Sequence, residues 1–281
     1  MPRLAAELEP LRSPEYRRYL IGWTLYGASS WIFFTAITWT FLASDGAAAA
    51  VGYLPLVLVI PVPVALVVSG ILTDRRGPRD VVIAGLILNG VAMAAGAALV
   101  AVGAFTFVPT LVVGFIVGIS TGIVTVPGQM LMLRLVEQRH ASGAAGSNLL
   151  TIAGARVLGG PIGGLIVALG GAVPAFLVAA AATLPRMSGF DGHPRRASAL
   201  DVGRALQWAT RARGALAVIA LGAAMALFVF PYMSMLSVVA RDLVKGGAGD
   251  LGLLIGAGGI GVAIAAFAIH LLNRWFTRGR G

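Results

Sequence analysis

Eight apolar runs, separated by polar segments of different lengths, dominate the chain. They cover residues 19–43, 51–72, 80–103, 105–127, 144–169, 171–185, 214–240 and 249–272. A helix needs about 20 predominantly apolar residues to cross a bilayer, so the pattern predicts eight membrane-spanning helices. The sixth run has only 15 residues and needs either a thinner bilayer or an extension through Met187 in order to span.

The positions of the basic residues give the expected orientation. Of the 21 Lys and Arg residues, 18 lie in the two terminal segments and in the loops after the second, fourth and sixth runs. Arg241 and Lys245 lie in the opposite loops, and Arg156 lies inside the fifth run. Because Lys and Arg concentrate on the cytoplasmic side, we expect a multi-pass protein of the plasma (inner) membrane of a bacterium, with both termini cytoplasmic. The sixth run must then span, since otherwise the basic segment 186–213 would face outward.

Composition agrees with a polytopic membrane protein. Hydrophobic residues make up 58% of the chain and charged residues 11%, and the mean hydropathy is +0.90, whereas soluble domains carry about 25% charged residues. The net charge of +10 does not indicate a nucleic-acid partner, because the basic residues lie at the predicted membrane surface. The absence of cysteine excludes disulfides and Cys-ligated metal sites.

A long polar segment divides the chain. Its second part, from Leu200 to Arg213, places Val202 and Leu206 on one side, which predicts a short amphipathic helix on the membrane surface. The expected parts are a six-helix transmembrane bundle (1–185), a cytoplasmic loop with this helix (186–213) and two further transmembrane helices (214–281). The first 18 residues contain four arginines, three glutamates and no apolar core, so we expect no cleavable signal peptide.

The loop after the second run carries a motif. It matches five of the six positions of the pattern Gly-x-x-x-Asp-Arg/Lys-x-Gly-Arg/Lys-Arg/Lys, with Pro78 in place of one basic residue. The matching residues are Gly70, Asp74, Arg75, Gly77 and Arg79. Further characteristic stretches are Pro127 to Arg139, Ala155-Arg156 to Gly160-Pro161, Phe230-Pro231-Tyr232 and Ala240-Arg241-Asp242. On these residues the chain resembles the major facilitator superfamily, and most closely its enterobactin-exporter-like branch of siderophore and drug exporters.

The resemblance implies an all-α membrane protein with a major-facilitator-like helical bundle. Its N-terminal half would have six helices in two inverted three-helix repeats, and the region after residue 213 would supply two helices of an incomplete C-terminal half. Since members of the superfamily have two six-helix halves, we expect a chain truncated after its eighth helix.

The implied function is that of a transporter that exports a small amphipathic molecule, siderophore- or drug-like, by alternating access. Its partners would be the lipid bilayer and the small-molecule substrate. The alternative is a transport-incompetent fragment that acts as a membrane scaffold or partner subunit, through self-association or by pairing with a chain that supplies the missing helices.

Two roles are open for the loop motif. The resemblance implies that the motif is a gate. Gly70 would let a neighbouring helix approach, and Asp74 would cap a helix or pair with an arginine in one of two rocking states. From the residues alone, an anchor for a tight turn at the headgroups is equally well supported.

Arg156 is a charge placed inside a predicted span. Such a charge costs at least about 2.5 kcal/mol in a membrane and normally faces a cavity or a partner. One possibility is a contact with an anionic substrate, such as a catecholate or carboxylate. The others are a structural bond to carbonyl groups or to Ser and Asn side chains of adjacent helices, and a side chain that reaches the membrane surface if the span is shifted.

Two helical faces are further candidates for the substrate pathway. In the first run a polar stripe combines Thr24, Trp31, Thr35 and Thr38, which fall within roughly 40° of one another; the stripe lines a solvent-accessible pathway or bonds to neighbouring helices. In the seventh run Met225, Phe228, Tyr232 and Met235 share a face beside Pro231. That face suits an apolar or aromatic substrate or ordinary packing.

Enzyme chemistry has no support in the sequence. His140, His193 and His270 lie far apart, and no metalloprotease, nucleophile-elbow or phosphate-loop motif occurs. We therefore expect no enzyme, no cofactor and no metal site.

Overall fold

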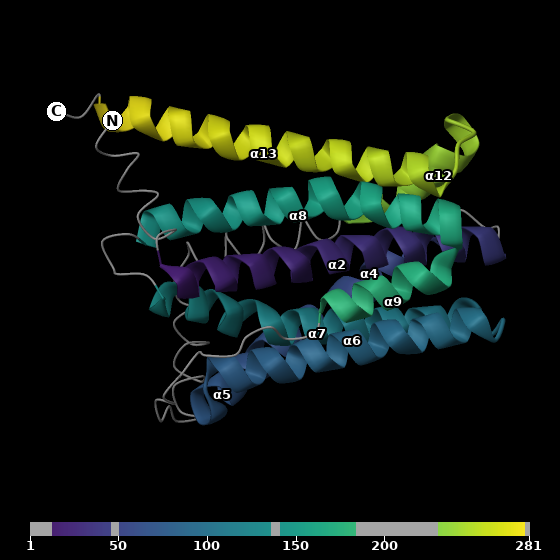
Figure 1. The fold of residues 1–281 in the computed structure, drawn as a ribbon, viewed down its shortest axis with the longest axis horizontal. Coiled ribbons are helices and arrows are strands. Elements are labelled where there is room, and N and C mark those ends of the chain that lie inside the picture. The colour runs from purple at the N-terminus through teal and green to yellow at the C-terminus, as the bar shows by residue number, and fades with distance from the viewer. Residues whose placement is uncertain (1–12, 46–50, 136–140, 184–229, 279–281) are drawn as a thin grey trace.

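The computed structural model describes residues 13–45, 51–135, 141–183 and 230–278, and within these ranges the regular elements are all helical (Figure 1). They are α2 (Pro14–Asp45), α4 (Tyr53–Val59), α5 (Val62–Arg76), α6 (Pro78–Ala101), α7 (Phe107–Arg134), α8 (Ala141–Gly170), α9 (Ala172–Ala182), α12 (Phe230–Val238), the π-helix η4 (Val239–Leu243) and α13 (Ala248–Arg278). The predicted all-α fold is confirmed. The loop 186–213, Met225 and Phe228 lie outside the described residues.

Within the described residues, six stretches of helix are long and apolar enough to cross a membrane. They are Pro14–Ala43, Tyr53–Arg76, Pro78–Ala101, Phe107–Arg134, Leu150–Gly170 and Ala248–Ala265, and they correspond to the first five predicted spans and the eighth. In the sixth apolar run α9 has 11 residues. The described part of this run is therefore about half as long as a helix that crosses a bilayer. The seventh run is described only from Phe230 onward.

The second span is not one continuous helix. It consists of α4 and α5, which meet at Ile60 and Pro61. Proline has no N–H to donate to the preceding turn, so the regular bonding is interrupted there. Helical hydrogen bonding resumes in the next turn, where the N–H of Ala65 donates to the carbonyl of Pro61 at 3.0 Å.

The turn between α5 and α6 explains one residue of the loop motif. Gly77 has a φ of +88°, a conformation that costs glycine little and other residues more. Its N–H donates to the carbonyl of Thr73 at 2.9 Å and ends α5, and Pro78 then begins α6. Proline suits this first helical position because its fixed φ is already helical.

The helices run side by side in alternating directions. Figure 1 shows the start of α2, the α5–α6 turn, the end of α7, the start of α8 and the end of α13 at one end of the bundle. The α6–α7, α8–α9 and α12–α13 connections lie at the other end. Both described ends of the chain therefore lie at the end that carries Asp74 and its neighbouring arginines.

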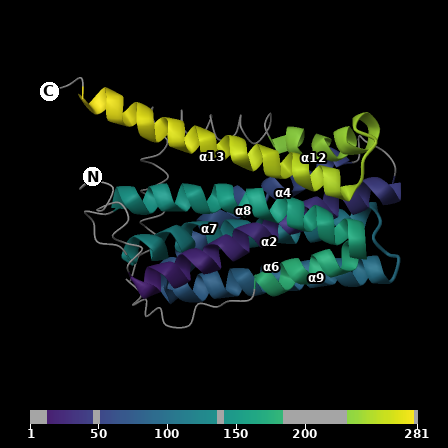
Figure 2. The ribbon, with the colours of Figure 1, turned by 45° about the horizontal axis from the view of Figure 1, so that its top comes forward.

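Among the described helices, α8 and α13 make the most extensive contact, and glycines line it. A Cβ atom on Gly252 would lie 3.0 Å from the Cα of Gly164 and 3.1 Å from the Cα of Pro161. Without side chains at these positions the two backbones touch, which is a common way for helices to associate in lipid. Toward its C-terminal end α13 diverges from α8 (Figure 2), and Ile260 and Ile264 are exposed.

Candidate functional site

Arg156 projects from the middle of α8 into the space between α2 and α13. It is the sixteenth of the 30 residues of α8, and its side chain is 7% exposed. The Nε atom donates to the carbonyl oxygen of Ile255 on α13 at 3.1 Å. The Cζ atom lies 4.8 Å from the ring centroid of Trp31 on α2. One charged side chain thus contacts two helices besides its own.

The guanidinium retains donors for a ligand. Arginine carries five N–H donors in a rigid fork, and the Nε bond to Ile255 uses one of them. Within the described part of the chain, the two terminal amino groups of Arg156 make no hydrogen bond. These groups form the edge that binds a carboxylate or a similar pair of oxygens with two parallel bonds.

An aromatic pair lies beside the charge. Trp31, which the guanidinium contacts, packs edge-on against Phe34, with ring centroids 5.9 Å apart. Tyr232 on α12 is half exposed, at 53%. Among the described contacts, the structure brings together Trp31 and Arg156, two of the residues predicted for the substrate pathway. Phe228 was predicted with them and lies outside the described residues.

The threonines of the predicted polar stripe bond to their own helix. Thr24 donates to the carbonyl of Leu20, Thr35 to that of Trp31 and Thr38 to that of Phe34, at 2.7 to 2.9 Å. Thr35 and Thr38 are fully buried. A Cβ atom on Gly163 of α8 would lie 3.3 Å from the Cβ of Thr35, so this part of the stripe packs against a helix. The pathway role of Thr24, Thr35 and Thr38 stays a prediction.

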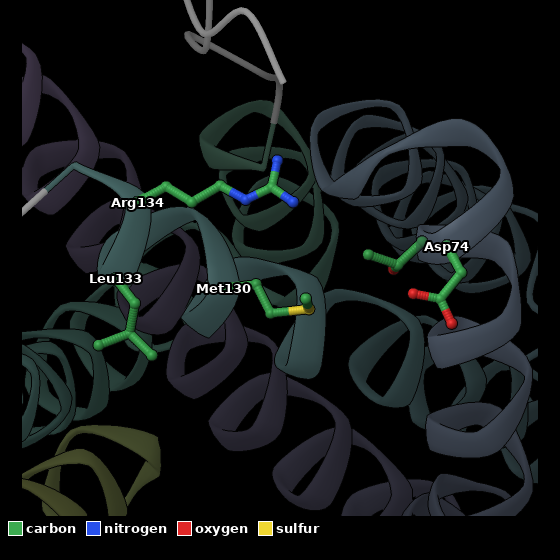
Figure 3. Close-up of a pocket in the computed structure, with 5 residues that line it drawn as sticks. Asp74, Met130, Leu133 and Arg134 are labelled. Atoms are coloured by element: carbon green, nitrogen blue, oxygen red, sulfur yellow. The ribbon is translucent and has the colours of Figure 1, made fainter. Parts of the chain in front are cut away.

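The loop motif borders a cavity at the end of the bundle where α5 and α7 meet. The cavity has a volume of about 300 Å³, and its lining residues are Thr73, Asp74, Met130, Leu133 and Arg134. Figure 3 shows the Asp74 carboxylate and the Arg134 guanidinium on opposite walls, projecting from α5 and α7. Arg134 was not among the residues predicted for this site, since its position after a long apolar run gave no sign that it would face Asp74.

Two details of the loop motif differ from the roles considered for it. Among the described atoms, none lies within 4 Å of a Cβ built on Gly70, so the close helix approach expected there is not seen. Asp74 does not cap α6, whose N-cap is Gly77. Arg75 is exposed and Arg79 is half-buried at the same turn.

A second polar link lies at the opposite end of the bundle. Arg241 of η4 pairs with Asp242 at 2.7 Å and also donates to the carbonyl of Leu42, near the end of α2, at 3.4 Å. A cation at a helix C-terminus is favourable because the helix dipole is negative there. The hydrogen bond from Arg241 favours the carboxylate form of Asp242 and holds the pKa of that carboxyl below its usual value. In the described ranges no group of three or more His, Cys, Asp or Glu residues could hold a metal.

Comparison with known proteins supports the fold and gives a family. The sequence profile of a family of the major facilitator superfamily, described as transmembrane secretion effector, matches residues 5–280. No curated protein sequence matches the chain. The fold is similar to that of a D-xylose-proton symporter (TM-score 0.63, 17% identity) and to that of the inward-open xylose transporter XylE from E. coli (TM-score 0.59, 15% identity). Each comparison covers 92% of this chain and 68% of the other chain.

Proposed function

Because the chain belongs to the transmembrane secretion effector family of the major facilitator superfamily, we propose that it exports a small amphipathic molecule, siderophore- or drug-like, by alternating access. The anionic group of that molecule binds the terminal amino groups of Arg156. Its apolar or aromatic part lies against Trp31 and Tyr232.

The environment of Arg156 is the observation that carries this proposal. A charge at membrane depth costs at least about 2.5 kcal/mol. Arg156 makes one hydrogen bond, to a carbonyl at 3.1 Å, and lies over one aromatic ring, so several of its N–H donors remain unused. A purely structural arginine would use its terminal amino groups as well. A carboxylate or catecholate satisfies them with two parallel charge-assisted bonds, which are among the strongest available to a protein.

Alternating access is supported by polar groups at both ends of the bundle. Asp74 and Arg134 face one cavity at the end where the described chain begins and ends, and Arg241 reaches the carbonyl of Leu42 at the other end. We assign Gly70, Asp74, Arg75, Gly77 and Arg79 to the cytoplasmic gate. Contacts of this kind favour one of two rocking states if they are made in that state alone.

The orientation follows from the arginine-rich end. Three arginines, Arg75, Arg76 and Arg79, lie at the α5–α6 turn, at the same end of the bundle as the start of α2 and the end of α13 (Figure 1). By the positive-inside rule this end is cytoplasmic, and the membrane is the inner membrane of a bacterium. The description of the family as a secretion effector supports outward transport.

A matched pair of probes tests the binding site. We would measure the affinity of the purified protein in nanodiscs for 2,3-dihydroxybenzoate and for 2,3-dihydroxybenzamide, which differ in charge and hardly in shape. We expect the carboxylate to bind at least about tenfold more tightly, since charge-assisted bonds are roughly twice as strong as neutral ones. Arg156→Gln should remove this difference, and Arg156→Lys should restore part of it.

Two results would contradict the proposal. One is equal binding of the two probes by the unmodified protein. The other is an Arg156→Gln variant that melts at a lower temperature and still prefers the carboxylate, because Arg156 would then act only as a structural link between α8 and α13.

A further inference from the structure

The glycines of α13 do not all face the same kind of neighbour, and one of them lies against the Arg156 guanidinium. A Cβ atom on Gly258 would overlap the Nη2 atom of Arg156 and lie 2.9 Å from its Cζ and 3.4 Å from its Nε. These three atoms belong to one side-chain head group. We propose that Gly258 is a positioning residue that holds the Arg156 guanidinium in its binding orientation; this proposal rests on the proposed function of Arg156.

The neighbouring glycines of α13 serve a different purpose. A Cβ on Gly252 would meet the backbone of Gly160 and Gly164, and a Cβ on Gly259 would lie 2.8 Å from the backbone nitrogen of Val157. Backbone atoms cannot move without displacing a helix, so these glycines set the distance between α8 and α13. Gly258 faces the mobile end of a side chain and is not needed for that distance.

The missing side chain at Gly258 therefore fixes where the guanidinium can lie. With glycine at this position, Arg156 has room to approach α13 closely enough to bond the carbonyl of Ile255, three residues earlier in the same helix. The same placement keeps its Cζ over the ring of Trp31. A methyl group at Gly258 would push the head group away from its present position, and its two contacts and its free donors would shift together.

The Gly258→Ala change is expected to disturb the binding site and to leave the fold intact. An arginine side chain has several rotatable bonds and can relax away from a new methyl group. Alanine is also a better helix former than glycine. A Gly258→Ala variant is therefore expected to remain folded, with a melting temperature at or above that of the unmodified protein.

The experiment follows Trp31 and probe binding in parallel. The protein is labelled with 5-fluorotryptophan, and Trp31→Phe assigns the Trp31 signal in the fluorine NMR spectrum. We expect both Arg156→Gln and Gly258→Ala to shift this signal, and Gly258→Ala to weaken 2,3-dihydroxybenzoate binding about tenfold. Gly261→Ala is the matched control, because nothing in the described part lies within 4 Å of a Cβ at that glycine; it should leave both readouts unchanged.

A double variant separates positioning from a general effect on the helix. If Gly258 acts through Arg156, then adding Gly258→Ala to Arg156→Gln changes neither the Trp31 signal nor the affinity further. An additional loss in the double variant, an unshifted Trp31 signal in Gly258→Ala, or failure of Gly258→Ala to fold would each overturn the proposal. If Arg156→Gln leaves probe binding intact but both single variants shift the Trp31 signal, the proposed substrate contact fails and the positioning of Arg156 by Gly258 stands.

Discussion

The guanidinium of Arg156 lies over the indole of Trp31, with the Cζ atom 4.8 Å from the ring centroid. The arginine belongs to the fifth apolar run and the tryptophan to the first. This contact, together with the bond to Ile255, joins α2, α8 and α13 at one point. A substrate that binds there would contact three helices at once, which is a suitable position for coupling binding to helix movement.

Trp31→Leu tests the aromatic part of this site. A cation over an aromatic face gains about 0.5 to 2 kcal/mol, so loss of the ring should free the guanidinium and weaken 2,3-dihydroxybenzoate binding by about threefold or more. Trp31→Phe keeps a ring and should lose less. Titration of the purified variants measures both effects, and equal affinities in the unmodified protein and Trp31→Leu would show that the ring does not orient Arg156.

Gly252→Ala tests the glycine contact between α8 and α13. The new methyl group would approach the carbonyl oxygen of Gly160 to 2.5 Å and the Cα of Gly164 to 3.0 Å. Overpacking of this kind typically costs about 1 to 3 kcal/mol, and we expect a lower melting temperature in nanodiscs. Gly261→Ala again serves as the control. An unchanged melting temperature in Gly252→Ala would mean that the two helices are free to move apart there.

Asp74→Asn tests the gate at the arginine-rich end. If the Asp74 carboxylate pairs with Arg134 across their shared cavity when this end is closed, removal of its charge favours opening at this end. The chain has no cysteine, so a single cysteine can be placed at Thr38, which is fully buried. We expect faster labelling of this cysteine from the cytoplasmic side in Asp74→Asn than in the parent. Unchanged labelling with normal protein abundance would leave Asp74 as a turn anchor.

The hydropathy pattern predicts most of the helices. Where the helix boundaries differ from the prediction, the cause is a single residue at that point. Apolar runs predicted both ends of α6 and α8, and the start of α13, to within three residues because a membrane requires length and low polarity. The break at Pro61 was missed, since a hydropathy pattern does not record a lost backbone donor. The helix α5 continues to Arg76, four residues beyond the predicted span, because it ends only where Gly77 adopts its positive φ.

The candidate site was predictable in its residue types but not in its contacts. Helical periodicity grouped Trp31 with Thr35 and Thr38, yet it cannot distinguish a face that lines a cavity from one that packs on a helix. Arg156 stood out as a charge inside an apolar run. Its partner at Ile255 is a backbone carbonyl 99 residues away, and a carbonyl leaves no signature in a sequence. The role inferred for Gly258 also depends on this contact.

Topology is tested by cysteines at opposite ends of the bundle. Val102 and Gly247 are exposed at the end with the α6–α7 and α12–α13 connections, and Arg76 is exposed at the other end. A membrane-impermeant maleimide should label Val102→Cys and Gly247→Cys in intact cells, because the proposed orientation places this end outside the cell. Arg76→Cys should react only after the membrane is opened. The reverse pattern would overturn the proposed orientation.

Counterflow tests the central claim most directly, because it requires alternating access and needs no knowledge of the coupling ion. Vesicles that contain the protein are preloaded with unlabelled 2,3-dihydroxybenzoate and diluted into a trace of the labelled compound. We predict transient accumulation of label well above that in protein-free vesicles, with Arg156→Gln at the protein-free level although it is folded and inserted. Equal uptake by vesicles with and without the protein, or equal uptake with the unmodified protein and with Arg156→Gln, would contradict the account.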